Sequence, residues 1–118
     1  FNETAKTFAP YFLLSELNHH LLEGLAFPRE NRRRLRFVFL SSSLYHPRIQ
    51  RRLQITRDLV ARMGIATTVI PLRGSSREAA AVEALSLSSF ATYYLGLLYR
   101  RDPVAIPYVD EFKRRLGR

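Results

Sequence analysis

The sequence predicts an α/β domain with a parallel sheet, because two short apolar runs flank a segment of helical pattern. Residues Leu35–Leu40 are nearly all apolar, with Arg36 as the interruption, and Ile65–Leu72 is rich in branched residues. Runs of this kind suit strands that are covered on both faces. A helix between them implies a right-handed crossover, so we expect the two strands to be parallel and adjacent or nearly so.

Helices are expected in four places, with loops or charged connectors between them. In chain order the helices are Tyr11–Leu25, Pro47 to about Met63, Arg77 to about Tyr99, and Val109–Leu116, and the connectors are Phe1–Pro10, Arg29–Arg34 and Ser41–Tyr45. Gly24, Gly64 and Asp102-Pro103 are stop signals. Ser75 or Ser76 is an expected N-cap. The buried side of the second helix is predicted to carry Ile49, Leu53, Leu59, Val60 and Met63.

Two strands make a poor sheet, since such a sheet exposes most of its polar edge. The 118 residues suffice for one small domain, and 47% of them are hydrophobic. We therefore expect the sheet to be incomplete in this chain and to pair with further strands, from a missing N-terminal segment or from another subunit.

Composition removes several classes of function. Without cysteine there is no disulfide, no thiolate zinc site and no cysteine nucleophile. A metal site needs three or four ligands, and the histidines and carboxylates show no such grouping, so no metal is expected. Nothing in Phe1–Pro10 reads as a signal peptide, and a cytoplasmic location is expected. The net charge of +9 favours an anionic partner.

The segment Ala79–Tyr99 is long enough for a membrane span, but Glu83 and several hydroxyl residues dilute it. We interpret it as a buried or interface helix, with no membrane partner. Its large apolar residues are too many for an exposed helix on a small domain and predict self-association: Phe90, Tyr93, Tyr94, Leu97 and Leu98.

Three stretches carry residues with catalytic potential: Asn2–Lys6, Glu16–Gly24 and Asp110–Arg114. Each also has an ordinary structural explanation. Glu3 and Lys6 could be a solvated pair, and the carboxylates and histidines four residues apart in the second stretch could pair on a helix surface. Lys113 could belong to a basic helix end that faces water.

A family resemblance favours the catalytic interpretation. Asn2-Glu3-Thr4-Ala5-Lys6 resembles the Asn-Glu-Asn-x-Lys motif of the bifunctional phosphoglucose/phosphomannose isomerases. Glu16-Leu17-Asn18-His19, followed by Gly24, is similar to their Glu-Leu-Asn-His-Asn-Glu segment, and His46-Pro47-Arg48-Ile49 to their His-Pro-Arg-Ile. The tail Leu95–Leu116 is also similar. Each motif alone is weak, whereas four in register are fairly specific.

The resemblance implies that residues 1–118 are the C-terminal portion of a three-layer SIS-type (flavodoxin-like) sugar-isomerase domain, assembled as a homodimer. The implied reaction is aldose–ketose isomerisation of a hexose 6-phosphate, in glycolysis and gluconeogenesis, without a cofactor. Glu3 matches the base that moves a proton between carbons one and two. His19 matches a ring-opening histidine contributed by the neighbouring subunit, and Lys113 matches a lysine that reaches the site from the final helix.

The chain departs from the family pattern at His20, where asparagine is usual, and at Leu21, where glutamate is usual. The family's phosphate-binding serines and threonines, and an arginine near the reacting carbons, lie in the first domain, and we expect this chain to begin after them. Two alternatives stay open: a non-catalytic SIS-type module that binds sugar phosphate or dimerises, and a basic nucleic-acid binder. The second would use the arginines Arg29, Arg32, Arg33, Arg34, Arg36, Arg48, Arg51 and Arg52, but no aromatic stacking platform accompanies them.

Overall fold

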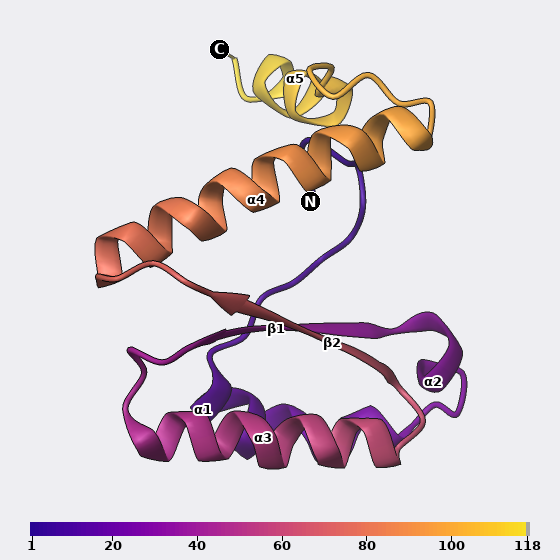
Figure 1. Ribbon diagram of the computed structural model, residues 1–118. Helices are drawn as coiled ribbons and strands as arrows, with labels where there is room; N and C mark the ends of the chain where they lie inside the picture. The colour runs from indigo at the N-terminus through magenta and orange to yellow at the C-terminus, as the bar shows by residue number, and fades with distance from the viewer. Residues whose placement is uncertain (118) are drawn as a thin grey trace. The chain divides into compact units, whose positions relative to one another are not determined.

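A computed structural model describes residues 1–117, and Arg118, the last residue of the expected domain, lies outside them. The chain divides into two compact units. The larger unit is Tyr11–Ala84, and the smaller unit combines Phe1–Pro10 with the chain from Leu85 onward. Helix α4, Arg77–Leu98, continues from the larger unit into the smaller one (Figure 1).

The sheet of the larger unit consists of two parallel strands, as the sequence predicts. Strand β1, Arg36–Ser42, pairs with β2, Ala66–Leu72, in a register that places Arg36 opposite Ala66 and Ser42 opposite Leu72. The expected loop Ser41–Tyr45 therefore starts too early, because its first two serines continue the ladder. The Ser42 hydroxyl accepts the Leu44 N–H at 3.2 Å just after the strand ends.

Helix α3, Pro47–Arg62, joins the strands and begins where the sequence predicts. The Nδ1 atom of His46 accepts the Arg48 N–H at 3.2 Å and caps the helix, so this histidine has a structural role. Gly64 follows the helix with φ +81°, the left-handed conformation that glycine favours. Of the expected inward residues, Leu53 and Val60 are buried and the other three are half-buried.

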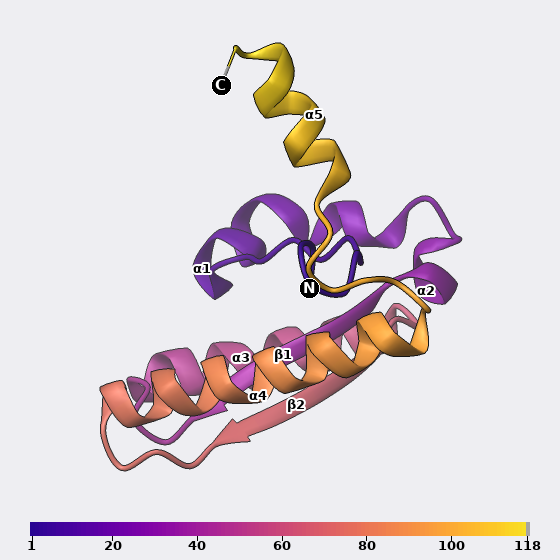
Figure 2. The same ribbon diagram turned by 90° about the horizontal axis from the view of Figure 1, so that it is seen from above.

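The core of the larger unit lies between one face of the sheet and α3 (Figures 1 and 2). Its buried members are Leu25, Phe39, Leu53, Val60 and Ile65. The opposite face of β1 is less covered, since Val38 is 50% exposed and Leu40 is 43% exposed. The sequence predicts a strand that is covered on both faces. Within Tyr11–Ala84 the face of β1 that carries Val38 and Leu40 is only partly covered.

The prediction of one helix over Tyr11–Leu25 is wrong. The segment begins extended and then forms three short pieces: α1 (Leu14–Glu16), the π-helix η1 (Leu17–Leu21) and the 3₁₀-helix η2 (Glu23–Ala26). A further short helix, α2 (Asn31–Arg34), occupies the expected charged connector. The Asn31 side chain donates to the carbonyls of Leu25 (3.2 Å) and Phe27 (2.9 Å), which stabilises a chain reversal that leucine spacing does not encode.

Helix α4 begins as predicted, with Ser76 as its N-cap. The Ser76 hydroxyl accepts the Ala79 N–H at 3.1 Å. The pKa of the Glu78 carboxyl is lowered by a hydrogen bond from the backbone N–H of Glu78 itself and by a second one from the Ser76 side chain. The backbone amides of Arg73 and Gly74 donate to the Glu83 carboxylate at 2.6 and 2.8 Å. The carboxylate of Glu83 therefore occupies both backbone amides before the helix.

In the smaller unit, α4 ends one residue before the predicted Tyr99 and is closed by a Schellman motif. Arg100 adopts φ +54°, its N–H donates to Leu97 O, and the Arg101 N–H donates to Gly96 O, both at 2.9 Å. The last helix, α5, covers Pro107–Arg115 and begins two residues earlier than expected. Its early start reflects Pro107, which suits the first helical position.

Helix α4 is long and apolar enough to cross a membrane, judged by length and composition alone. From Leu85 onward most of its large apolar side chains are exposed, and Leu95 is half-buried. The exposed residues are Leu85, Leu87, Phe90, Tyr93, Tyr94, Leu97 and Leu98. The burial expected for this helix is therefore not supplied by residues 1–117, and its use as an interface stays a prediction.

Candidate active site

Glu3 lies in a compact N-terminal loop, Phe1–Pro10, of the smaller unit. The loop is built from its own hydrogen bonds: the amides of Ala5 and Thr7 donate to Phe1 O at 3.1 and 3.2 Å. The side chain of Asn2 bonds both backbone groups of Ala9, accepting its N–H at 3.0 Å and donating to its carbonyl at 2.9 Å. This connected backbone presents the Glu3 side chain to solvent.

Lys6 ties the loop together and to the chain that follows α4. Its ammonium group donates to the carbonyl of Glu3 and, at 3.3 Å, to the carbonyl of Pro103. The residue has φ +53°, an uncommon conformation for a side chain with a Cβ. Lys6 therefore binds the backbone of Glu3, and among residues 1–117 no hydrogen bond engages the Glu3 carboxylate.

His19 lies in the π-helix η1 of the larger unit and is exposed. The preceding residue, Asn18, donates to the hydroxyl of Thr56 at 2.7 Å, and that hydroxyl donates to Arg52 O at 2.7 Å. Thr56 is only 1% exposed. A buried hydroxyl of α3 thus anchors the turn that carries His19, and a π-helical turn frequently marks a functional position.

The imidazole of His20 lies beside that of His19. The two ring centroids are 4.5 Å apart at an interplanar angle of 72°. No ion pair with Glu16 or Glu23 occurs in the described chain, so the surface-pair interpretation of these histidines is not realised.

Lys113 lies on α5 and is exposed. The carboxylate of Glu111 pairs instead with Arg114 and with Arg115, the latter at 2.6 Å. None of the ion pairs found in residues 1–117 includes Lys113. Its ammonium group is therefore available to an external anion, whereas its two arginine neighbours are engaged within the helix.

The three predicted site residues are distributed over both units: Glu3 and Lys113 belong to the smaller unit and His19 to the larger. Together they supply a carboxylate, an ammonium group and an imidazole, all exposed. Each group is of a type used in proton transfer beside a carbonyl: a carboxylate as a base, an ammonium group as a cation and an imidazole as a proton donor or acceptor. Across residues 1–117, no group of three histidine or carboxylate side chains could hold a metal ion.

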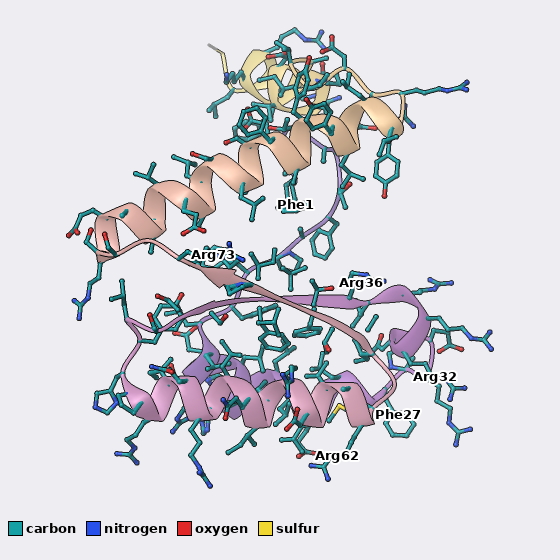
Figure 3. The ribbon with its side chains drawn as sticks, viewed as in Figure 1. Phe1, Phe27, Arg32, Arg36, Arg62 and Arg73 are labelled. Atoms are coloured by element: carbon teal, nitrogen blue, oxygen red, sulfur yellow. The ribbon has the colours of Figure 1, made fainter. Side chains whose placement is uncertain are left out.

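The aromatic side chains near the arginine-rich segments differ in exposure. Phe39 is buried in the core and Phe37 is half-buried, so neither can stack on a base. Phe27 is 69% exposed beside Arg29 and Arg32, where a hollow of about 160 Å³ opens, and Figure 3 shows the Phe27 and Arg32 side chains projecting outward. A single aromatic ring does not make a stacking platform of the kind that single-stranded nucleic acid requires.

Sequence reasoning missed the residues that hold the site loops in place. Asn2 and Lys6 were identified only as parts of a motif, and Thr56 was not identified at all. The hydrogen bond of Thr56 joins it to Asn18, 38 residues earlier in the chain. A threonine among the inward positions of α3 was the one available signal, because a buried hydroxyl needs a partner.

Comparison with known proteins agrees with the resemblance seen in the motifs. Residues 1–116 match the family model described as the bacterial phospho-glucose isomerase C-terminal SIS domain. A bifunctional phosphoglucose/phosphomannose isomerase of Caldicellulosiruptor bescii is 30% identical over 98% of this chain and 34% of its own length. The proteins of the same name from Thermoplasma acidophilum and Aquifex aeolicus are 29% and 25% identical, over 99% and 98% of this chain and 36% of their own lengths.

The chain therefore spans about a third of the length of these relatives. No solved structure matches it. The matched region includes all three predicted site residues.

Proposed function

We propose a function from one premise: the chain belongs to the family of bacterial phosphoglucose isomerase C-terminal SIS domains. Its α/β architecture with a two-stranded parallel sheet agrees with a domain of this type. On this premise the chain is part of an enzyme that isomerises a hexose 6-phosphate, interconverting glucose 6-phosphate and fructose 6-phosphate. The name of its relatives adds mannose 6-phosphate as a second substrate to test.

The observation that carries the proposal is the place of the three motif side chains within the family match. Glu3, His19 and Lys113 are all exposed, and none takes part in an ion pair within residues 1–117. Exposed charged side chains without partners are common on this chain, so their availability alone does not select these three residues. What supports their assignment is that all three lie within the region matched by the family model, at positions that resemble the family motifs.

In the proposed mechanism Glu3 takes a proton from carbon two of the open-chain sugar and returns it to carbon one. The enediolate that forms in between carries negative charge on oxygen, and the ammonium group of Lys113 stabilises it. The oxygen on carbon one then gains a proton and the hydroxyl on carbon two loses one, so the sum of the steps is aldose to ketose. His19 acts earlier, by moving a proton between the ring oxygen and the anomeric hydroxyl so that the ring opens. The steps are proton transfers throughout and need no organic cofactor and no metal.

The proposal predicts hydrogen exchange at carbon two. We expect the complete enzyme to isomerise glucose 6-phosphate in deuterated water and to place deuterium at carbon one of the fructose 6-phosphate that forms. The reverse step should place deuterium at carbon two of the recovered glucose 6-phosphate, because the base exchanges its proton with solvent. The isolated 118-residue chain should show little or no turnover, since the family resemblance places the phosphate-binding residues in the other domain. The measurement is NMR of the sugar product. A complete protein that binds hexose 6-phosphate without isomerisation or exchange would favour the non-catalytic module instead.

We also propose that the exposed face of α4 is covered by a second copy of the chain, in a cytoplasmic homodimer. Phe90 is 66% exposed, Tyr94 60% and Leu98 78%. An apolar surface of this kind is unusual on an isolated soluble domain. We predict that the complete protein is a dimer by light scattering and that Tyr94→Lys shifts it toward monomer. The control is Arg101→Lys, which leaves the apolar face intact. A monodisperse monomer of the parent protein at high concentration would contradict the prediction.

A further inference from the structure

Gly96 is placed where α4 meets the loop that carries Glu3, within the smaller unit. A Cβ built on Gly96 would lie 2.9 Å from the carbonyl oxygen of Thr4 and 3.7 Å from the Cα of Ala5. The first distance is shorter than a carbon and a carbonyl oxygen tolerate, and the obstacle is backbone, which no rotamer change can move aside. Ala5 is fully buried at this contact.

Glycine in a helix normally destabilises it by roughly 0.5–1 kcal/mol relative to alanine. Gly96 has no left-handed conformation that would call for glycine, since it belongs to the last turn of α4. Its use is therefore explained by the close approach of the loop backbone. The same residue accepts the Arg101 N–H that closes the helix, so the loop and the end of α4 share this position.

Lys6 holds the loop from its other side. Its ammonium group reaches the carbonyl of Glu3 and the carbonyl of Pro103, which lies in the turn after α4. The loop is thus fixed at two points: Thr4 and Ala5 rest on Gly96, and the backbone of Glu3 is bonded through Lys6. Both points flank the proposed base directly.

We infer that Gly96 and Lys6 are positioning residues, which set where the Glu3 carboxylate stands relative to the sugar. The inference rests on the proposed function, because it assumes that Glu3 is the base. A base displaced by about 1 Å can cost on the order of a hundredfold in rate, since proton transfer requires a closely defined geometry. Substrate binding depends less on this loop, because the phosphate is expected to be held in the other domain.

The test is Gly96→Ala in the complete enzyme. We expect kcat to fall by roughly ten- to a hundredfold while KM changes by less than about threefold, the pattern of an interaction that acts in the chemical step. Amide hydrogen exchange in Phe1–Pro10 should become faster by about tenfold, because the loop loses its seat on the helix. Lys6→Met should give the same two changes. If Gly96→Ala does not fold, Lys6→Met still tests the inference.

The matched control is Ala91→Ser, because it adds a single atom at an exposed position of the same helix. It should exchange and turn over like the parent enzyme. Parent-like loop exchange or parent-like kcat in both Gly96→Ala and Lys6→Met would overturn the inference. The exchange readout does not depend on catalysis. If Glu3→Gln were fully active while Gly96→Ala still loosened the loop, the identity of the base would fail and the seating of the loop would stand.

Discussion

The Glu3→Gln variant of the complete enzyme is expected to lose isomerase activity by about a hundred- to ten-thousand-fold while binding sugar phosphate nearly as well as the parent. The amide preserves the shape and hydrogen-bonding reach of the carboxylate but cannot accept the substrate proton. The loop should stay in place, because its hydrogen bonds use the Glu3 backbone carbonyl and not the side chain. The decisive measurement is hydrogen exchange at carbon two in deuterated water.

Glu30→Gln provides the matched control for this variant. Glu30 is also exposed, and its side chain makes no capping hydrogen bond at the start of α2. Its replacement should leave both exchange and turnover unchanged. If Glu3→Gln exchanges as fast as the parent enzyme, Glu3 is not the base and the catalytic assignment fails.

The exposure of Glu3 in this chain bears on how it could act as a base. A carboxylate in water is a weak base, and enzymes raise its pKa by partial desolvation. Residues 1–117 leave Glu3 exposed, so any desolvation has to come from the substrate, the other domain or a partner subunit. This requirement agrees with the expectation that the isolated chain has little activity.

The parts of the fold that sequence predicts best are those determined by local pattern. The apolar runs identified both strands, and Pro47 and Ser76 marked the starts of α3 and α4. These features depend on residues close together in the chain, where periodicity and capping chemistry act directly. The parallel pairing of β1 and β2 was predicted from the helix between them, because a crossover connection of this kind joins parallel strands.

The prediction failed where a distant contact overrides local preference. The leucine spacing of Tyr11–Leu25 is that of a single helix, yet the segment contains a π-helical turn in which Asn18 bonds to Thr56, 38 residues later. Local periodicity carries no information about that partner. The seat of the Glu3 loop on Gly96 was missed for the same reason, since it joins residues more than ninety positions apart.

One face of the sheet in the larger unit is only partly covered. Val38 and Leu40 point away from the core of the larger unit, although strands rich in apolar residues are usually covered on both sides. The matched region is about a third of each relative, so the rest of each relative is about twice as long as this chain. Cover for this face, and further strands for the sheet, are expected from that sequence or from a second subunit.

The His19→Ala variant is expected to lower turnover of hexose 6-phosphate by about a hundredfold, because closed rings then open without a positioned proton donor and acceptor. The defect should be much smaller with a tetrose 4-phosphate, in which the hydroxyl that would close a ring is phosphorylated. Deuterium incorporation at carbon two, measured for both substrates, separates ring opening from isomerisation. His20→Ala is the matched control: its ring lies 4.5 Å from that of His19, yet only His19 matches the family motif. Equal losses with both substrates, or a larger loss in His20→Ala, would contradict the assignment of ring opening to His19.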